Sequence, residues 1–151
     1  MSEQSTIESG ASPTLQPDPG SLVPRADETK RLLIVDDDPI SRNIVRDLVV
    51  GRGFEAEGAD GAQAALEKVR RQRYDLLILD IFLPGLDGRV LHGSIEKINP
   101  GLTERTIFIS HWVPTGAIAE YVAKHGVFLK KPFAAEDLLK AIRVTLGVAS
   151  C

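Results

Sequence analysis

The chain has little of what several protein classes require. Its one cysteine, Cys151, is the last residue, so no internal disulfide can form, which fits a reducing compartment. No apolar run is long enough to cross a bilayer, and residues 1–20 have no basic segment followed by an apolar stretch. Basic residues number 18 against 21 acidic ones, so the net charge of -3 would not gather nucleic acid. We expect a cytoplasmic protein that binds neither nucleic acid nor membranes directly.

The 151 residues suit one folded domain behind a polar tail. Residues 1–30 contain five serines, four prolines and few large apolar side chains, so they bury too little surface to offset the entropy of ordering. This tail is predicted to be disordered. From residue 31 onward, strand-like and helix-like patterns alternate. We expect the folded domain to span residues 31–148 and the chain to fray at 149–151.

Five short apolar runs predict strands at residues 32–35, 54–59, 75–80, 106–110 and 127–129. Continuous apolar strands are typical of a parallel sheet that is buried on both faces. A helical pattern follows each run, and roughly 120 residues suffice for one core. The predicted fold is therefore α/β, a (βα)₅ three-layer sandwich.

Capping residues and apolar spacing locate the helices. Asp38-Pro39 is predicted to start the first helix, with a buried face made by Ile40, Ile44, Leu48, Val45 and Val49. Asp60 and Gln63 resemble a capping box for the second helix. The third helix is predicted to end at Asn99-Pro100-Gly101. The last ends at about Gly147, so we expect no output domain after it.

Polar side chains stand at the ends of four predicted strands. Asp36 and Asp37 follow the first strand, Asp80 ends the third, Ser110 ends the fourth, and Lys131 follows the fifth. The carboxyl ends of parallel strands meet at one edge of the sheet, where open α/β folds place their sites. Together these groups have the chemistry to hold Mg²⁺ and a phosphoryl group.

Four segments, VDDDP, LLILDIFLPGLDG, TIFIS and LKKPF, resemble in order and spacing the markers of bacterial response-regulator receiver domains. The resemblance covers about residues 31–148. It implies a flavodoxin-like fold with strand order 2-1-3-4-5. It also implies phosphorylation of one aspartate by a sensor histidine kinase or a histidine phosphotransfer protein.

By this resemblance, Asp80 is the phosphoacceptor, and Asp36 and Asp37 bind Mg²⁺ (or Mn²⁺) together with Asp80 and the backbone carbonyl of Phe82. The residue types make chemical sense. A carboxylate attacks an anionic phosphoryl group poorly unless a divalent ion neutralises the developing charge, and Mg²⁺ prefers oxygen ligands. Clustered carboxylates without metal repel one another, so their pKa values should be raised and their titrations coupled.

The same resemblance assigns the switch. Ser110 and Lys131 would contact the phosphoryl oxygens, and the inward turn of Ser110 would free space for Phe128 to rotate from exposed to buried. The Lys131-Pro132 bond is a candidate cis peptide. The readout would be an altered surface made by the fourth helix, the fifth strand and the fifth helix.

Two features depart from the family pattern. His111 occupies the position after the switch hydroxyl, where a small residue is usual, and is a possible modulator of dephosphorylation. The stretch from Gly126 to Lys131 is about two residues shorter than usual, and Phe128 lacks a tyrosine hydroxyl. The shorter stretch and Phe128 put the mode of partner recognition in doubt, but not the phosphorylation chemistry.

Several polar residues have a simpler interpretation. Asp38 is predicted to act only as a helix cap, and Asp87 as a turn residue beside Gly88. His92 and His125 are predicted to lie on helix surfaces, since no metal-ligand spacing links them.

We expect a stand-alone response regulator with possible homodimerisation. It is not expected to be an enzyme beyond phosphorylating itself from small donors and dephosphorylating itself. One alternative is a haloacid-dehalogenase-type phosphatase with Asp36 as nucleophile and Asp38 as acid. Another is a degenerate receiver that acts as an unphosphorylated binding module.

Overall fold

The computed structural model describes residues 29–147. The main sheet contains five strands, which are β2 (Arg31–Val35), β3 (Glu55–Ala59), β4 (Leu76–Asp80), β7 (Thr106–Ser110) and β8 (Val127–Lys130). Nearly all of the predicted tail, and the predicted frayed end, lie outside the described residues. Within 29–147, no helix combines the length and apolar character needed to cross a membrane.

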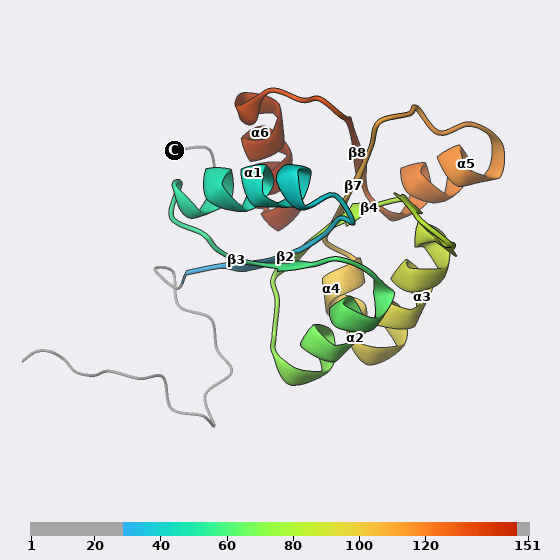
Figure 1. The fold of residues 1–151 in the computed structure, drawn as a ribbon, viewed down its shortest axis with the longest axis horizontal. Coiled ribbons are helices and arrows are strands. Elements are labelled where there is room, and N and C mark those ends of the chain that lie inside the picture. Colours follow the sequence, from blue (N-terminus) through green and yellow to red (C-terminus); the bar gives the residue numbers. More distant parts are fainter. Residues whose placement is uncertain (1–28, 148–151) are drawn as a thin grey trace, which may run out of the picture.

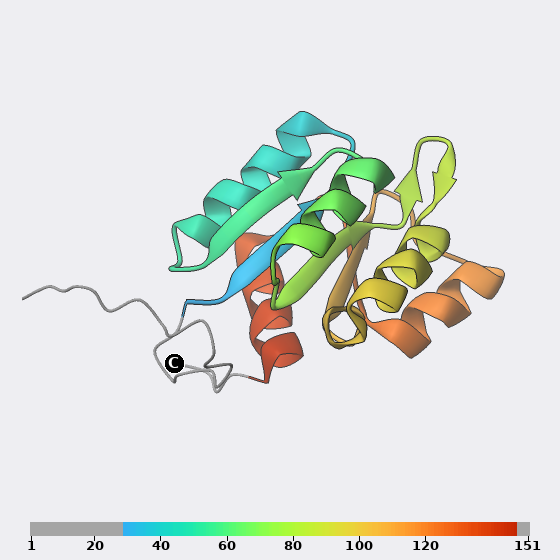
Figure 2. The ribbon, with the colours of Figure 1, turned by 90° about the horizontal axis from the view of Figure 1, so that it is seen from below.

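All strand pairs in the main sheet are parallel, and their spatial order is β3-β2-β4-β7-β8. In chain order this is 2-1-3-4-5, which confirms the predicted flavodoxin-like topology. Figure 2 shows the strands running in one direction. Their register places Val35 beside Leu79, Asp80 beside Ile109, and Ser110 beside Lys130. The carboxyl ends of all five strands therefore meet at one edge.

Helices cover both faces of the sheet (Figure 1). On one face lie α1 (Pro39–Val50) and α6 (Ala135–Leu146). On the other lie α2 (Ala62–Arg71), α3 (Gly88–Ile98), the short α4 (Pro100–Thr103) and α5 (Gly116–His125). Alternate residues of each strand point to opposite faces, so Leu32 and Ile34 pack in one core while Leu33 and Val35 pack in the other.

Helix α1 begins as predicted but buries a narrower face. The Asp38 carboxylate accepts a hydrogen bond from the Ile40 N–H at 3.0 Å. Val45 and Val49 are buried, whereas Ile40 and Ile44 are 70% and 62% exposed. At about 100° per residue, Ile44 is one step around the helix from Val45, and Ile40 is further away. The prediction that both isoleucines belong to the buried face was wrong.

Other local predictions also need correction. The N-cap of α2 is Gly61 and makes no side-chain cap bond, so the predicted capping box of Asp60 and Gln63 is absent. Gln63 is thereby the second helical residue, one position too early to reach back to the cap. Asn99 ends α3 but also caps α4, accepting from the Leu102 N–H.

Two connections are important, one at the carboxyl edge of the sheet and one at its amino edge. The loop after β4 forms a hairpin of β5 (Phe82–Leu83) and β6 (Leu86–Asp87), which projects from the end of the sheet (Figure 2). Between α5 and β8 there is a single residue, Gly126. An added Cβ at Gly126 would meet the Phe108 ring at 2.9 Å, which requires something to shift.

Two glycines of α3 should respond oppositely to alanine. A Cβ at Gly88 would lie 2.6 Å from the Ile81 carbonyl oxygen, whereas a Cβ at Gly93 meets nothing within 4 Å. We expect Gly88→Ala to lower the free energy of unfolding by about 1–3 kcal/mol through overpacking. Gly93→Ala should raise it by about 0.5–1 kcal/mol through helix propensity. Urea denaturation measures both, and equal effects of the two variants would contradict the packing described here.

Candidate functional site

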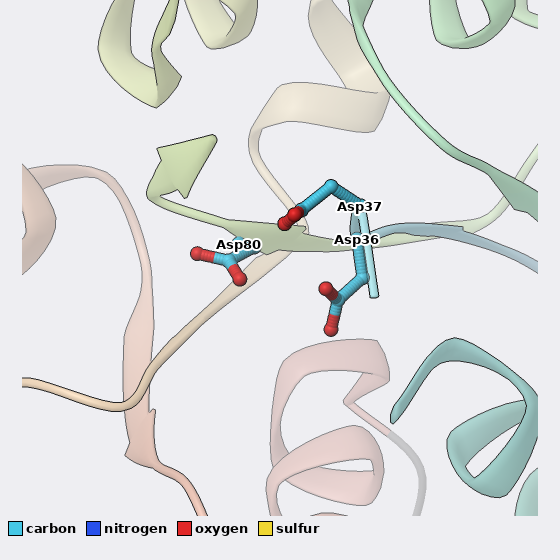
Figure 3. Close-up of side chains that lie close together, drawn as sticks. All are labelled: Asp36, Asp37 and Asp80. Carbon is cyan, nitrogen blue, oxygen red and sulfur yellow. The ribbon is translucent and has the colours of Figure 1, made fainter. Parts of the chain in front are cut away.

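Three carboxylates converge where β2 and β4 end (Figure 3). Asp36 and Asp37 directly follow β2, and Asp80 is the last residue of β4. Each offers an oxygen that lies within 4.8 Å of the others. Asp36 and Asp80 are buried, whereas Asp37 is exposed. Because the two strands are paired in parallel, their carboxyl-terminal residues reach the same place.

Lys131 joins the two buried carboxylates from the neighbouring end of β8. Its Nζ lies 2.8 Å from Asp36 Oδ2 and 3.1 Å from Asp80 Oδ2. The Lys131 side chain is 5% exposed, so both ion pairs are shielded from water. A buried charge is costly without a partner, so both carboxylates depend on Lys131 and Lys131 depends on having at least one of them. The Lys131-Pro132 peptide is cis.

Hydrogen bonds from the start of α1 fix Asp36. Its Oδ1 accepts from the Asp38 N–H at 3.0 Å and its Oδ2 from the Ser41 hydroxyl at 2.9 Å. Arg42 donates to the Asp36 carbonyl at 2.7 Å. Ser41 Oγ is also 3.5 Å from Lys131 Nζ. Sequence analysis missed Ser41, although its place in the first turn of a helix that starts at the acidic cluster was a usable signal.

Burial and the neighbouring charges together shift the pKa values of Asp80 and Lys131. Burial raises the pKa of Asp80 above its usual value, although the Phe82 N–H and Lys131 both favour the carboxylate. For Lys131, burial alone would lower the pKa, but the hydrogen bond to Asp36 and the charges of Asp80 and Asp36 outweigh it and raise the pKa. Lys131 is therefore charged at neutral pH.

The remaining predicted residues surround this centre. The buried Ser110 hydroxyl accepts from the Trp112 N–H at 2.9 Å, and no hydrogen bond joins it to Asp80 or Lys131 within the described residues. Phe128 is half-buried and packs against the core on the α5 side of the sheet. His111 is exposed and lines the cavity above Asp80, whose volume is about 570 Å³.

The donor set fits a divalent cation. Asp36, Asp37 and Asp80 carry three negative charges against the one positive charge of Lys131, which leaves two uncompensated. Carboxylate oxygens are the ligands that Mg²⁺ prefers. The Phe82 N–H donates to Asp80 Oδ1 at 2.9 Å, which places this loop beside the cluster. The cavity also has room for a phosphoryl group.

Asp87 has a local structural role, as predicted, whereas His92 does not lie where it was predicted to lie. Asp87 caps α3 and is bound by Arg89 at 2.6 Å, so it belongs to local structure. His92, which was predicted to lie on the helix surface, is only 1% exposed. The prediction failed because the third helix packs beneath α5, a contact that its own periodicity does not reveal.

The chain belongs to the response regulator receiver domain family. Residues 32–143 match the sequence pattern of that family. Among curated relatives, it is 36% identical to the chemotaxis protein CheY of Bacillus subtilis over 120 residues, 78% of this chain and 98% of that protein. It is 34% identical to the response regulator MprA of Mycobacterium leprae over 77% of this chain and half of that protein.

Solved structures agree with this assignment. A CheY-like receiver domain protein from Methanospirillum hungatei matches with a TM-score of 0.71 and 28% identity, over 80% of this chain and 95% of that one. The response regulator TrrA of Thermotoga maritima, solved in complex with Mg²⁺-BeF, matches with a TM-score of 0.68 and 27% identity, over 78% of this chain and all of that one.

Removing the Asp80 charge should stabilise the metal-free protein. Because burial raises the pKa of Asp80, its ionised form is disfavoured in the folded state, and Lys131 keeps Asp36 as a partner. We expect Asp80→Asn to raise the free energy of unfolding at pH 7 in EDTA by on the order of 1 kcal/mol. Urea denaturation with and without Mg²⁺ measures this.

The gain should depend on pH with a defined sign. A carboxyl whose folded pKa is raised stabilises most below its unfolded pKa, about 3.9, and loses that contribution as the pH rises through the folded value. The advantage of Asp80→Asn should therefore vanish near pH 4. Millimolar Mg²⁺ should stabilise the wild type more than the variant. A destabilised variant in EDTA would contradict this account.

Proposed function

We propose that this receiver domain accepts a phosphoryl group on Asp80 from a sensor histidine kinase or a histidine phosphotransfer protein. The observation that carries the proposal is the Asp80 carboxylate, which lies at the cavity beside Asp36 and Asp37 and within reach of Lys131. The structural neighbour TrrA, solved with Mg²⁺-BeF, supports a metal-dependent phosphoryl site in this fold.

Mg²⁺ (or Mn²⁺) would be held by Asp36, Asp37, Asp80 and the backbone carbonyl of Phe82. When bound, it neutralises charge that develops on the transferring phosphoryl group. An Asp80 oxygen forms the new O–P bond while the N–P bond of the donor phosphohistidine breaks, and its electron pair returns to the imidazole. Lys131 already stands 3.1 Å from Asp80 Oδ2, where it can contact a phosphoryl oxygen.

The phosphoryl group would then compete for Ser110. Its hydroxyl, now an acceptor for the Trp112 N–H, can turn and donate to a phosphoryl oxygen. That turn would pull on the loop of residues 111–115 and open space near Phe128. The surface formed by α5, β8 and α6 would change as a result. Because only Gly126 links α5 to β8, we expect this surface to differ from that of a receiver domain with a longer connection.

Exposed apolar side chains near the cavity suit a protein donor. Phe82 and Trp112 lie with their ring centroids 6.2 Å apart at the cavity rim, and Ile40 and Ile44 are exposed on α1. Such residues are candidates for burial when a partner docks its phosphohistidine over Asp80. Homodimerisation and a cytoplasmic location stay predictions.

The two alternative functions have less support. In a haloacid-dehalogenase-type phosphatase Asp38 would act as an acid, but its carboxylate is committed to the Ile40 N–H as a helix cap. A degenerate receiver would lack part of the acid, hydroxyl and lysine set, which this chain has in full. Turnover of a phosphate ester would favour the phosphatase.

Phosphorylation can be measured directly. With Mg²⁺ and acetyl phosphate or a cognate kinase, we expect one phosphoryl group per chain on Asp80. Intact-mass spectrometry should show the added mass in the wild type and none in Asp80→Asn, whose amide cannot form the acyl phosphate. Asp87→Asn is the matched control, because Asp87 is a nearby aspartate committed to Arg89, and it should label normally. Equal labelling of wild type and Asp80→Asn would reject the assignment.

His111 should affect how long the phosphoryl group persists. Its exposed imidazole lines the cavity, where it can obstruct the water that attacks the acyl phosphate. We expect His111→Ala to shorten the phosphoryl half-life several-fold, measured as loss of the added mass after the donor is removed. Lys124→Ala, on the outer part of α5, should leave the half-life unchanged. Equal half-lives for wild type and His111→Ala would dispose of this role.

A further inference from the structure

The phosphoryl chemistry does not use the buried histidine of α3. His92 of α3 lies against α5 and β7, with its ring centroid 5.2 Å from that of Phe108 and 5.5 Å from those of Tyr121 and His125. It is 1% exposed. A buried imidazole is costly unless both ring nitrogens have partners, so its hydrogen bonds determine its role.

Those partners form a directed chain. His92 Nδ1 is 2.7 Å from the Tyr121 hydroxyl, and Nε2 is 3.3 Å from Thr106 Oγ1. Thr106 Oγ1 donates its only proton to the Thr103 carbonyl at 2.9 Å, so it must accept from His92 Nε2–H. In a neutral imidazole Nδ1 is then an acceptor, and Tyr121 donates to it. The chain thus links α5, α3, β7 and α4.

Helix α5 depends on this link more than the other helices do. Of its ten residues Val122 alone is buried, and the Tyr121 ring packs on Phe108 with centroids 6.3 Å apart. The helix directly follows the loop after Ser110 and leads through Gly126 to Phe128. If that loop moves on phosphorylation, either α5 moves with it and strains the Tyr121–His92 hydrogen bond, or the loop bends while α5 stays in place.

We propose that Tyr121 and His92 are positioning residues that form a latch between α5 and α3. The latch holds α5 where Ser110 bonds its own loop. The inference rests on the proposed function, because the state it opposes is the phosphorylated one. Deleting the latch should make phosphorylation-like activation easier.

The surroundings of His92 favour its neutral form. Burial lowers the pKa of His92 and the charge of His125 adds to this, against a hydrogen bond with the Thr103 backbone and the charge of Glu96, which raise it. In the neutral ring Nδ1 accepts from Tyr121, and in the imidazolium Nδ1–H would donate to the Tyr121 oxygen, so the bond exists in either charge state.

The test measures binding of beryllofluoride, a phosphoryl mimic, in the presence of Mg²⁺. Trp112, the only tryptophan of the chain, lies at the cavity and provides a fluorescence readout. At pH 8, Tyr121→Phe should bind beryllofluoride about three- to tenfold more tightly than the wild type, since it lacks one hydrogen bond.

Measuring both proteins at the same pH cancels the titration of Asp80, which they share. His125→Gln is the control, because His125 bonds the Tyr121 backbone carbonyl and not the hydroxyl, and it should retain the wild-type affinity at pH 8. An affinity ratio of one at pH 8 overturns the latch.

A second measurement does not depend on phosphorylation. The ¹⁵N spectrum of the wild-type His92 ring at pH 7.5 should show the neutral tautomer with the proton on Nε2, and a ring protonated on Nδ1 overturns the latch. Amide hydrogen exchange in α5, but not in α6, should be faster in Tyr121→Phe, and unchanged α5 exchange would also overturn it. If the wild type fails to bind beryllofluoride, the proposed function fails, while these two measurements still judge the latch.

Discussion

The ion pairs of Lys131 with Asp36 and Asp80 are the interaction on which the site depends. Three charged groups are nearly excluded from water here, and their net charge is negative even before the exposed Asp37 is counted. The folded protein tolerates this arrangement because the Ser41 hydroxyl and the Asp38 N–H also donate hydrogen bonds to Asp36. Burying these charges lowers the stability of the folded protein. It also creates a centre that a divalent cation and a phosphoryl group can complete.

The parallel sheet makes that centre possible. Strands β2, β4 and β8 each deliver a polar residue just where the apolar run ends, and the register brings the ends level. Two cores, one on each face, hold the strands so that their ends cannot drift apart. Ser110 stands at the end of β7, beside the centre but bound to its own loop. The acidic cluster and the Ser110 hydroxyl are therefore neighbours on one edge.

Much of this could be predicted from the sequence because it depends on local patterns and one topological rule. Apolar runs marked the strands, and Asp36, Asp80 and Lys131 followed from their positions at strand ends. The failures concern contacts between elements. Burial of His92 depends on how α3 meets α5, and the exposure of Ile40 and Ile44 on how α1 rotates against the sheet. Neither the tertiary neighbour nor the rotation is contained in a single helix's periodicity.

The one-residue connection at Gly126 has a mechanical consequence. A longer loop could change its conformation when α5 is displaced and leave the strand in place. Here His125 ends the helix and Val127 already begins the strand. Even an added Cβ at Gly126 would meet the Thr106 carbonyl oxygen and the Phe108 ring, so there is little room for this residue to pivot. Helix α5 and strand β8 should therefore move as one rigid unit. A small rotation at the start of α5 would then also displace β8, the edge strand of the sheet.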